Sequence, residues 1–165
     1  MRIAGLTTAL VVVATVLGTT PSASASATSF CTQLGGTWNG QYCHTTVQSD
    51  RDAVREISVA IPAELIDDPA VGPVLREYLT TLVGNWRTVG KRMVADSFGE
   101  GNYQVFRHGD ALSLVYRETY HADGPDFNNA YRTFTFDMAR GTRLQLADLM
   151  KPGVDPLTAI PPLAH

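Results

Sequence analysis

Among the residues that could carry out chemistry, the serine at position 97 has the most suggestive surroundings. The segment Ala95-Asp96-Ser97-Phe98-Gly99 resembles a nucleophile elbow, but it lacks the first glycine and follows an expected helix rather than a strand. A carboxylesterase would need this serine, a base and an oxyanion site. The available bases and orienting acids are His44, His108, His121, Asp110, Asp123, Asp126 and Asp137. With so many candidates a triad can always be composed on paper, so Ser97 is kept as the candidate catalytic residue of an alternative function.

Acidic residues offer a second kind of chemistry, because glycoside hydrolysis uses two carboxyl groups that face one cleft. Glu100, Glu118, Asp123 and Asp126 lie near the ends of expected strands, but exposed acids in loops are common. The pair Asp123 and Asp126 lacks the dense, alternating oxygen ligands of a calcium loop. The sequence therefore predicts no metal site and no cofactor.

Binding is the more economical interpretation, and it centres on a polar segment from His121 to Asn129 with aromatic residues at its ends. Aromatic rings beside amides and carboxylates suit the recognition of a sugar or a protein. The residues expected to bind are Tyr120, His121, Asp123, Asp126 and Phe127. The alternative is that Phe127 only anchors the loop.

The amino terminus has the pattern of a secretory signal peptide. Arg2 precedes an almost wholly apolar run from Ile3 to Leu17, and two overlapping small-x-small sites end at Ala25 and Ala27. The run is about 15 residues long, whereas a membrane-spanning helix needs about 20. We therefore expect residues 1–27 to be removed, residues 28–165 to form a single exported domain, and the mature chain to lie outside the cell with no membrane attachment.

The two cysteines and the net charge narrow the class of protein further. Cys31 and Cys43 are the only cysteines in the sequence, and an isolated pair in an exported chain indicates one disulfide. A metal site would need further ligands, and one adjacent His44 does not supply them. Loss of Arg2 with the signal changes the formal charge from −3 to −4, and a mildly acidic chain is a poor candidate for binding nucleic acid.

The elements that must position these residues follow from hydrophobic periodicity. Residues 56–61 alternate as a strand, and apolar residues recur at helical spacing from about 73 into the 90s. After an expected breaker at 97–101, strands are predicted at 103–107, 112–120, 131–137 and 143–146, with a turn at His108-Gly109-Asp110 and a short helix at 147–150. The prediction is an α+β fold: an antiparallel sheet with one long helix packed on one face and a disulfide ring at the mature N-terminus.

These blocks, in this order, resemble the secreted mycobacterial immunogenic-protein family, whose C-terminal part is similar to the extracytoplasmic domain of the lysozyme-sensing anti-sigma factor. The matching pieces are the Cys31-to-Cys43 ring, the strand 57–62, the long helix and the stretch 134–153. Two departures stand out. The loop at 121–125 reads His-Ala-Asp-Gly-Pro where the family has Gly-Gly-Ala-His, and the chain ends where the family continues into a further helix and strands. The resemblance therefore implies a C-terminally truncated member.

A second, five-residue resemblance lies inside the disulfide ring. Trp38-Asn39-Gly40-Gln41-Tyr42 is similar to the Trp-Asn-Gly-Gln-aromatic step of some mannan-binding lectins. Together these observations favour a secreted, non-enzymatic interaction protein or antigen whose partner is a protein or carbohydrate outside the cell. The alternatives are a secreted carboxylesterase and a truncated chain without a function of its own.

Overall fold

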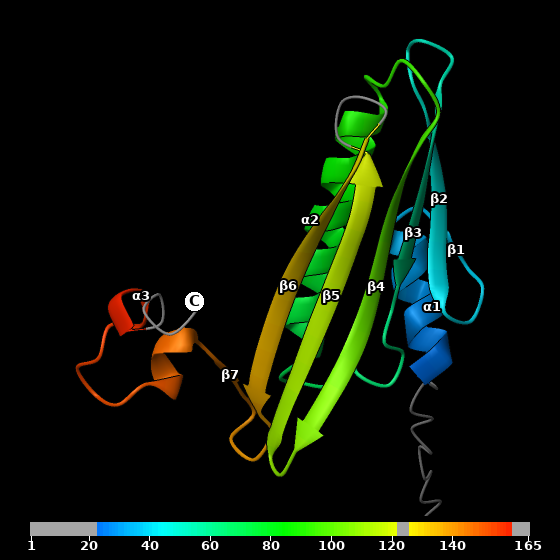
Figure 1. The fold of residues 1–165 in the computed structure, drawn as a ribbon. Helices are drawn as coiled ribbons and strands as arrows, with labels where there is room; N and C mark the ends of the chain where they lie inside the picture. The colour runs from blue at the N-terminus through cyan, green and yellow to red at the C-terminus, as the bar shows by residue number, and fades with distance from the viewer. Residues whose placement is uncertain (1–22, 122–125, 160–165) are drawn as a thin grey trace, which may run out of the picture.

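Alternation of buried and exposed side chains along the strands builds a single sheet (Figure 1). The computed structural model describes residues 23–121 and 126–159. Seven strands pair in chain order: β1 (Thr37–Trp38), β2 (Tyr42–Gln48), β3 (Val54–Ala60), β4 (Ser97–His108), β5 (Ala111–His121), β6 (Phe127–Asp137) and β7 (Thr142–Leu144). All neighbouring strands are antiparallel except β3 and β4, which are parallel. The α+β prediction is confirmed, and the sheet is mostly rather than wholly antiparallel.

The parallel pair exists because a long helix connects its two strands. Helix α2 (Gly72–Gly90) begins with a proline in its first turn and lies across one face of the sheet (Figure 1). Its apolar stripe is buried against the sheet: Leu75, Leu79, Leu82, Val83 and Trp86. The predicted helix is confirmed, and its crossover role follows from the length needed to return to a parallel neighbour.

Strand β4 begins earlier than the sequence pattern predicts. The segment Ser97–Gly101, expected to break the chain, is strand and pairs with both β3 and β5. The two glycines mislead the prediction because glycine is depleted in strands. Here Gly99 lies against the ring of Trp86, where an added Cβ would be 2.7 Å from Cε3. Close approach of the helix therefore requires glycine at this position.

The hairpins are close to those predicted. Gly109 and Asp110 form the two-residue turn between β4 and β5, with Gly109 at a φ of +54°. Strand β6 begins at Phe127 instead of Tyr131, and His121 pairs with Phe127. The polar segment expected to be a loop from 121 to 129 is therefore strand at both ends.

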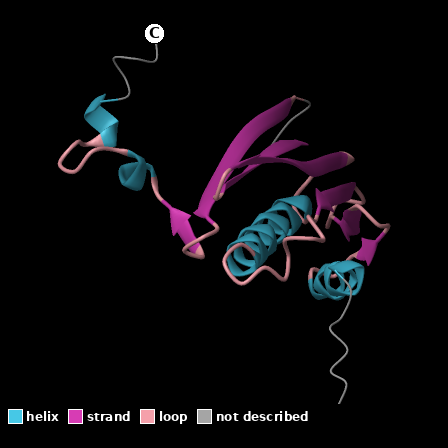
Figure 2. Ribbon diagram, turned by 90° about the horizontal axis from the view of Figure 1, so that it is seen from below, coloured by secondary structure: helices cyan, strands magenta, loops and turns pink. Residues whose placement is uncertain are grey.

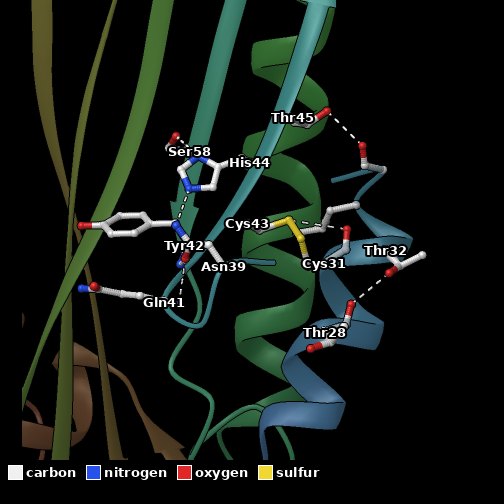
Figure 3. Close-up of a disulfide and its surroundings, with 12 residues drawn as sticks. Thr28, Cys31, Thr32, Asn39, Gln41, Tyr42, Cys43, His44, Thr45 and Ser58 are labelled. Carbon is white, nitrogen blue, oxygen red and sulfur yellow. Dashed lines mark hydrogen bonds between the residues drawn. A yellow bond between two sulfur atoms is a disulfide. The ribbon is translucent and has the colours of Figure 1, made fainter. Parts of the chain in front are cut away.

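An N-terminal helix, α1 (Ala23–Gln33), packs beside β1 and β2 and was not expected from the signal-like composition. Cys31 of α1 is bonded to Cys43 of β2, which confirms the predicted disulfide (Figure 3). Ala27 and Phe30 of the same helix are buried in the common core. The disulfide ring is thus a helix, a turn and a hairpin packed onto the domain.

The last described segment leaves the body of the domain. It follows β7, consists of a 3-10 helix at Leu146–Leu149 and the short α3 (Pro156–Ala159), and extends away from the sheet and α2 (Figure 2). The predicted strand at 143–146 is shorter and shifted, and the predicted helix at 147–150 is a single 3-10 turn. No residue of these two short helices is buried.

None of the described helices has the length and hydropathy required to cross a membrane.

Candidate functional site

None of the described helices covers the face of the sheet opposite α1 and α2 (Figure 2). Side chains on this open face alternate with the core residues of the same strands, so their position follows from the strand period of two. On β4 the residues that point this way include Phe98, Glu100 and Asn102, while Gly99 and Gly101 face the core. The open face therefore gathers outward side chains from several strands on one surface.

One register row on this face is polar across five adjacent strands. The backbone pairing places His44, Ser58, Glu100, Thr119 and Asn129 side by side, and we call this set the polar row. At one end His44 Nδ1 lies 2.7 Å from Ser58 Oγ. At the other, Thr119 Oγ1 donates to Asn129 Oδ1 at 2.9 Å, and Arg117 also donates to that oxygen. The row presents amide, hydroxyl, imidazole and carboxylate groups in a fixed order.

Aromatic side chains of β4 and β6 flank the polar row and, together with residues of β5, form a groove of about 640 Å³. The residues that define this sheet groove are Phe98, Glu100, Asn102, Arg117, Phe127 and Tyr131. Phe127 and Tyr131 are 59% and 61% exposed. Large exposed rings that cluster beside hydrogen-bonding groups are typical of a binding surface.

A second cluster surrounds the turn in the disulfide ring (Figure 3). Asn39 Oδ1 accepts hydrogen bonds from the backbone N–H groups of Gln41 and Tyr42, at 3.0 and 2.8 Å. Its amide Nδ2 must therefore be the donor to His44 Nε2, at 2.8 Å. Because Nε2 accepts, the neutral ring carries its proton on Nδ1 and donates it to Ser58 Oγ.

Gly40 completes the turn with a φ of +104°, as predicted for the Asn-Gly pair. The ring of Tyr42 points away from the disulfide, and its hydroxyl donates to Asn102 Oδ1 at 2.6 Å. Asn102 in turn donates to Glu100 Oε1 at 2.7 Å. These contacts join the turn to the sheet groove, so the two clusters are one continuous polar surface.

Three of the predicted binding residues lie at or near the groove. Phe127 lines it. His121 packs edge-on against Phe98, with ring centroids 4.6 Å apart, and its Nδ1 accepts a hydrogen bond from the Phe98 N–H at 3.2 Å. Asp126 is exposed immediately before Phe127. The structure therefore brings His121 and Phe127 around one residue, Phe98, that the sequence patterns did not single out.

The other predicted site residues are separated from the groove. Tyr120 points to the opposite face of the sheet and lies 5.9 Å from Trp86, ring to ring. Asp123 lies outside the described residues. Ser97 begins β4 with its hydroxyl buried and without a hydrogen-bond partner. No histidine bonds the Ser97 hydroxyl, although His121 lines the same cavity of about 280 Å³.

Glu118, one of the acids considered for glycoside chemistry, is also on the helix side. It is buried, accepts a hydrogen bond from the Tyr78 hydroxyl at 3.0 Å and lies 3.5 Å from Arg132. Burial and the nearby Glu118 carboxylate raise the pKa of Tyr78 well above its ordinary value. Glu100 lies on the other face, so these two acids do not share a cleft. In residues 23–121 and 126–159 no group of three or more potential ligands is placed to hold a metal ion.

Sequence reasoning missed most of the groove. Glu100 and Asn102 lie in or beside the segment expected to be a breaker, and Arg117 and Tyr131 belong to strands whose outward residues were not compared. A strict count of alternate positions along 97–108, 111–121 and 127–137 would have shown which side chains of each strand share a face. Their lateral alignment depends on register and is not visible in any single strand.

Comparisons with known proteins gave matches of two kinds, to a family model and to solved structures. A family model described as mannan-binding protein matches residues 20–57, a span that includes α1, β1, β2 and the turn at Asn39. No curated protein matches the sequence of the chain.

Solved structures similar to the chain include two proteins of the DUF3298 family. One, from Pseudomonas aeruginosa, shares 16% identity over 71% of this chain with a TM-score of 0.48. The other, from Bacteroides fragilis, shares 11% identity over 65% of this chain with a TM-score of 0.41. The chain spans 58% of the length of each. The predicted likeness to the immunogenic-protein family has no counterpart in these comparisons and stays a prediction.

Proposed function

We propose that this chain is an exported, non-enzymatic binding protein and that the open face of its sheet binds a carbohydrate. The observation that carries the proposal is the continuous surface formed by the polar row, the Asn39 turn and the exposed rings of the sheet groove. Sugar rings have an apolar face that packs on aromatic side chains and a rim of hydroxyl groups that pair with amides and carboxylates. The groove offers both kinds of group at adjacent positions.

The match of residues 20–57 to a mannan-binding family supports the choice of a mannose-containing ligand. The matched span contributes Asn39, Tyr42 and His44 to the surface, and Tyr42 connects it to Asn102 in the groove. Since the groups at both ends are already oriented by hydrogen bonds, the surface loses little conformational entropy on binding. We therefore expect an oligosaccharide that spans the turn and the groove to bind more tightly than free mannose.

The direct test is a glycan array followed by titration calorimetry with yeast mannan and with mannose. We expect mannan to bind. We expect Phe127→Ala and Tyr131→Ala each to lower the affinity for mannan about tenfold or more, because aromatic anchors carry much of the binding energy at such interfaces. Phe106→Ala is the matched control: Phe106 is 54% exposed and lies on the same strand as Phe98, but it does not line the groove. Absence of any glycan binding, or an equal loss in the Phe106 variant, would refute the proposal.

The turn can be tested separately from the groove. Replacement of His44 by Phe removes the acceptor for Asn39 and the donor to Ser58 while it keeps a ring at that position. We expect His44→Phe to weaken mannan binding and to leave the binding of free mannose in the groove unchanged. If both ligands lose affinity equally, the turn and groove are not separate parts of the site.

Export is part of the same proposal. The signal-like N-terminus and the Cys31–Cys43 disulfide fit an oxidising compartment outside the cytoplasm. Ala27 is 0% exposed and belongs to the core, so cleavage after Ala25 would keep it in the folded protein, whereas cleavage after Ala27 would remove it. We therefore propose cleavage after Ala25 in place of the removal of residues 1–27 expected from the sequence, so mass spectrometry of the exported protein should give Ser26 as the first residue. Recovery of the chain with Met1 attached and both thiols free would contradict export.

A further inference from the structure

A buried arginine without a carboxylate partner lies on the helix side of the sheet. Arg55 is 0% exposed, and burial lowers its pKa from the ordinary value. Its Nη1 donates to the backbone oxygen of His121 at 3.0 Å, but Nε and Nη2 are buried and have no hydrogen-bond partner. Within the described part of the chain, none of the salt bridges includes Arg55. Buried charges are normally paired, so these donors indicate a missing acceptor.

The two unpartnered nitrogens form one edge of the guanidinium group. Nε–H and one Nη2–H point in parallel, and this edge matches the two oxygens of a carboxylate. The third nitrogen, Nη1, is already used by His121 and fixes the orientation of the plane. The fork is therefore held in place and left open.

A second unpartnered donor lies beside the first. Arg55 and Ser97 are register partners on the parallel strands β3 and β4, and both side chains are on the core side. Neighbouring strands are about 4.8 Å apart, which places the Ser97 side chain next to the stem of Arg55. The Ser97 hydroxyl is buried and unpaired as well. Two independent orphaned groups thus face the same interior region.

Packing explains why Arg55 cannot turn away to solvent. A Cβ on Gly90, the last residue of α2, would lie 2.9 Å from Cδ of Arg55, so the end of the helix presses on the arginine stem. The carboxyl end of a helix carries partial negative charge, which favours a cation here but does not occupy the free N–H groups. The side chain is therefore confined with its fork inside the domain.

A cavity of about 280 Å³ reaches Ser97, the register partner of Arg55, although Arg55 itself is not among its lining residues. Ser97 and His121 line it, and they are the register partner and the hydrogen-bond acceptor of Arg55. Glu56 and Asp96 also line it, and their charges oppose entry of a multiply charged anion. The cavity thus suits a small, singly charged carboxylate better than a phosphate.

We infer that Arg55 and Ser97 form a binding site for a carboxylate, which receives two hydrogen bonds from the arginine fork and one from the serine hydroxyl. Arg55 and Ser97 face the helix side of the sheet, and the cavity that reaches Ser97 shares Phe98 with the sheet groove. The carboxylate belongs either to a small free acid or to an acidic group on a larger ligand that reaches in through the cavity.

The test follows the Arg55 Nε–H signal by NMR in protein labelled with 15N-arginine, assigned from its loss in Arg55→Lys. Titration with sodium formate, at ionic strength held constant with chloride, is expected to shift this signal to saturation. Ser97→Ala is expected to weaken formate binding about tenfold, because one hydrogen bond to a charged group is lost. About 100 mM formate is expected to raise Tm by roughly 3–5 °C, and the rise should disappear in Arg55→Met.

Arg140→Met is the matched control for that thermal measurement, since the Arg140 side chain is 79% exposed. It should keep the full formate effect. Glucuronate serves as the larger probe: tighter binding than formate assigns the site to an acidic group on a sugar, and weaker binding assigns it to a small free acid. An unsaturable shift of the Arg55 signal, or equal Tm shifts in Arg55→Met and the parent protein, would overturn the site and leave water as the occupant.

Discussion

The contact between Gly99 and Trp86 gives the sharpest test of how α2 is seated on the sheet. An alanine Cβ at position 99 would lie 2.7 Å from Cε3 and 2.8 Å from Cδ2 of the indole ring, which is closer than real Cβ atoms approach. Trp86 is 5% exposed and packs against Tyr120, so it has little space to move. Gly99→Ala must therefore displace the helix or β4.

The magnitude follows from two opposing effects. Overpacking a well-filled core costs about 1–3 kcal/mol, and replacing glycine by alanine in a compatible conformation returns about 0.4–1 kcal/mol through the unfolded state. We expect Gly99→Ala to lower the free energy of unfolding by about 1–2 kcal/mol. Gly101→Ala is the matched control, because its Cβ would meet Val59 Cγ1 at 3.4 Å, an ordinary contact. That variant should be unchanged or about 0.5 kcal/mol more stable.

Urea denaturation followed by tryptophan fluorescence measures both variants under one set of conditions. Since Phe98 and Glu100 flank Gly99 on the open face, a shift of β4 should also weaken glycan binding in Gly99→Ala alone. Equal stability of the two variants, within about 0.5 kcal/mol, would show that the helix does not rest on position 99 and that the seating described here is wrong.

Three further predictions concern other parts of the chain. Replacing both Cys31 and Cys43 by serine is expected to lower the free energy of unfolding, measured in urea, by about 3 kcal/mol, because the loop between positions 12 residues apart is no longer closed in the unfolded chain. A decrease below about 1 kcal/mol would show that packing alone holds α1 against the domain. Because the pKa of Tyr78 is raised in the folded state, the stability that this tyrosine contributes is complete below about pH 10 and is lost as the pH rises further. The free energy of unfolding, measured from pH 9 to 11, should therefore fall less steeply in Tyr78→Phe than in the parent protein, and parallel curves would argue against this. The purified protein should hydrolyse short-chain p-nitrophenyl esters no faster than the Ser97→Ala variant does, since no base bonds the Ser97 hydroxyl. Ester hydrolysis that this substitution abolishes would restore the esterase alternative.

Local patterns in the sequence were sufficient for the elements with strong periodicity. The apolar stripe of α2, the Gly109-Asp110 turn and the cysteine pair each depend on residues close in sequence or on one kind of bond, and all three are confirmed. The start of β4 was mispredicted because Gly99 and Gly101 have low strand propensity, and only the approach of Trp86 shows why glycine is needed there.

The polar segment from His121 to Asn129 shows the limit of that reasoning for the site. Its composition suggested a surface with aromatic and polar groups, but it could not tell that Tyr120 faces the helix while Phe127 faces the groove. Alternate residues of a strand lie on opposite faces of the sheet. Which set of residues faces the groove is fixed only when β5 and β6 pair in one register.

An α+β fold with a long amphipathic helix and a disulfide could be predicted from the residues alone, because periodicity and cysteine chemistry act over short distances along the chain. Which side chains are neighbours became visible only in the folded chain. The polar row joins residues from 44 to 129, and Arg55 is the register partner of Ser97, through lateral pairing of strands distant in sequence. Such pairing depends on the register and burial of the whole sheet, and no single segment encodes either.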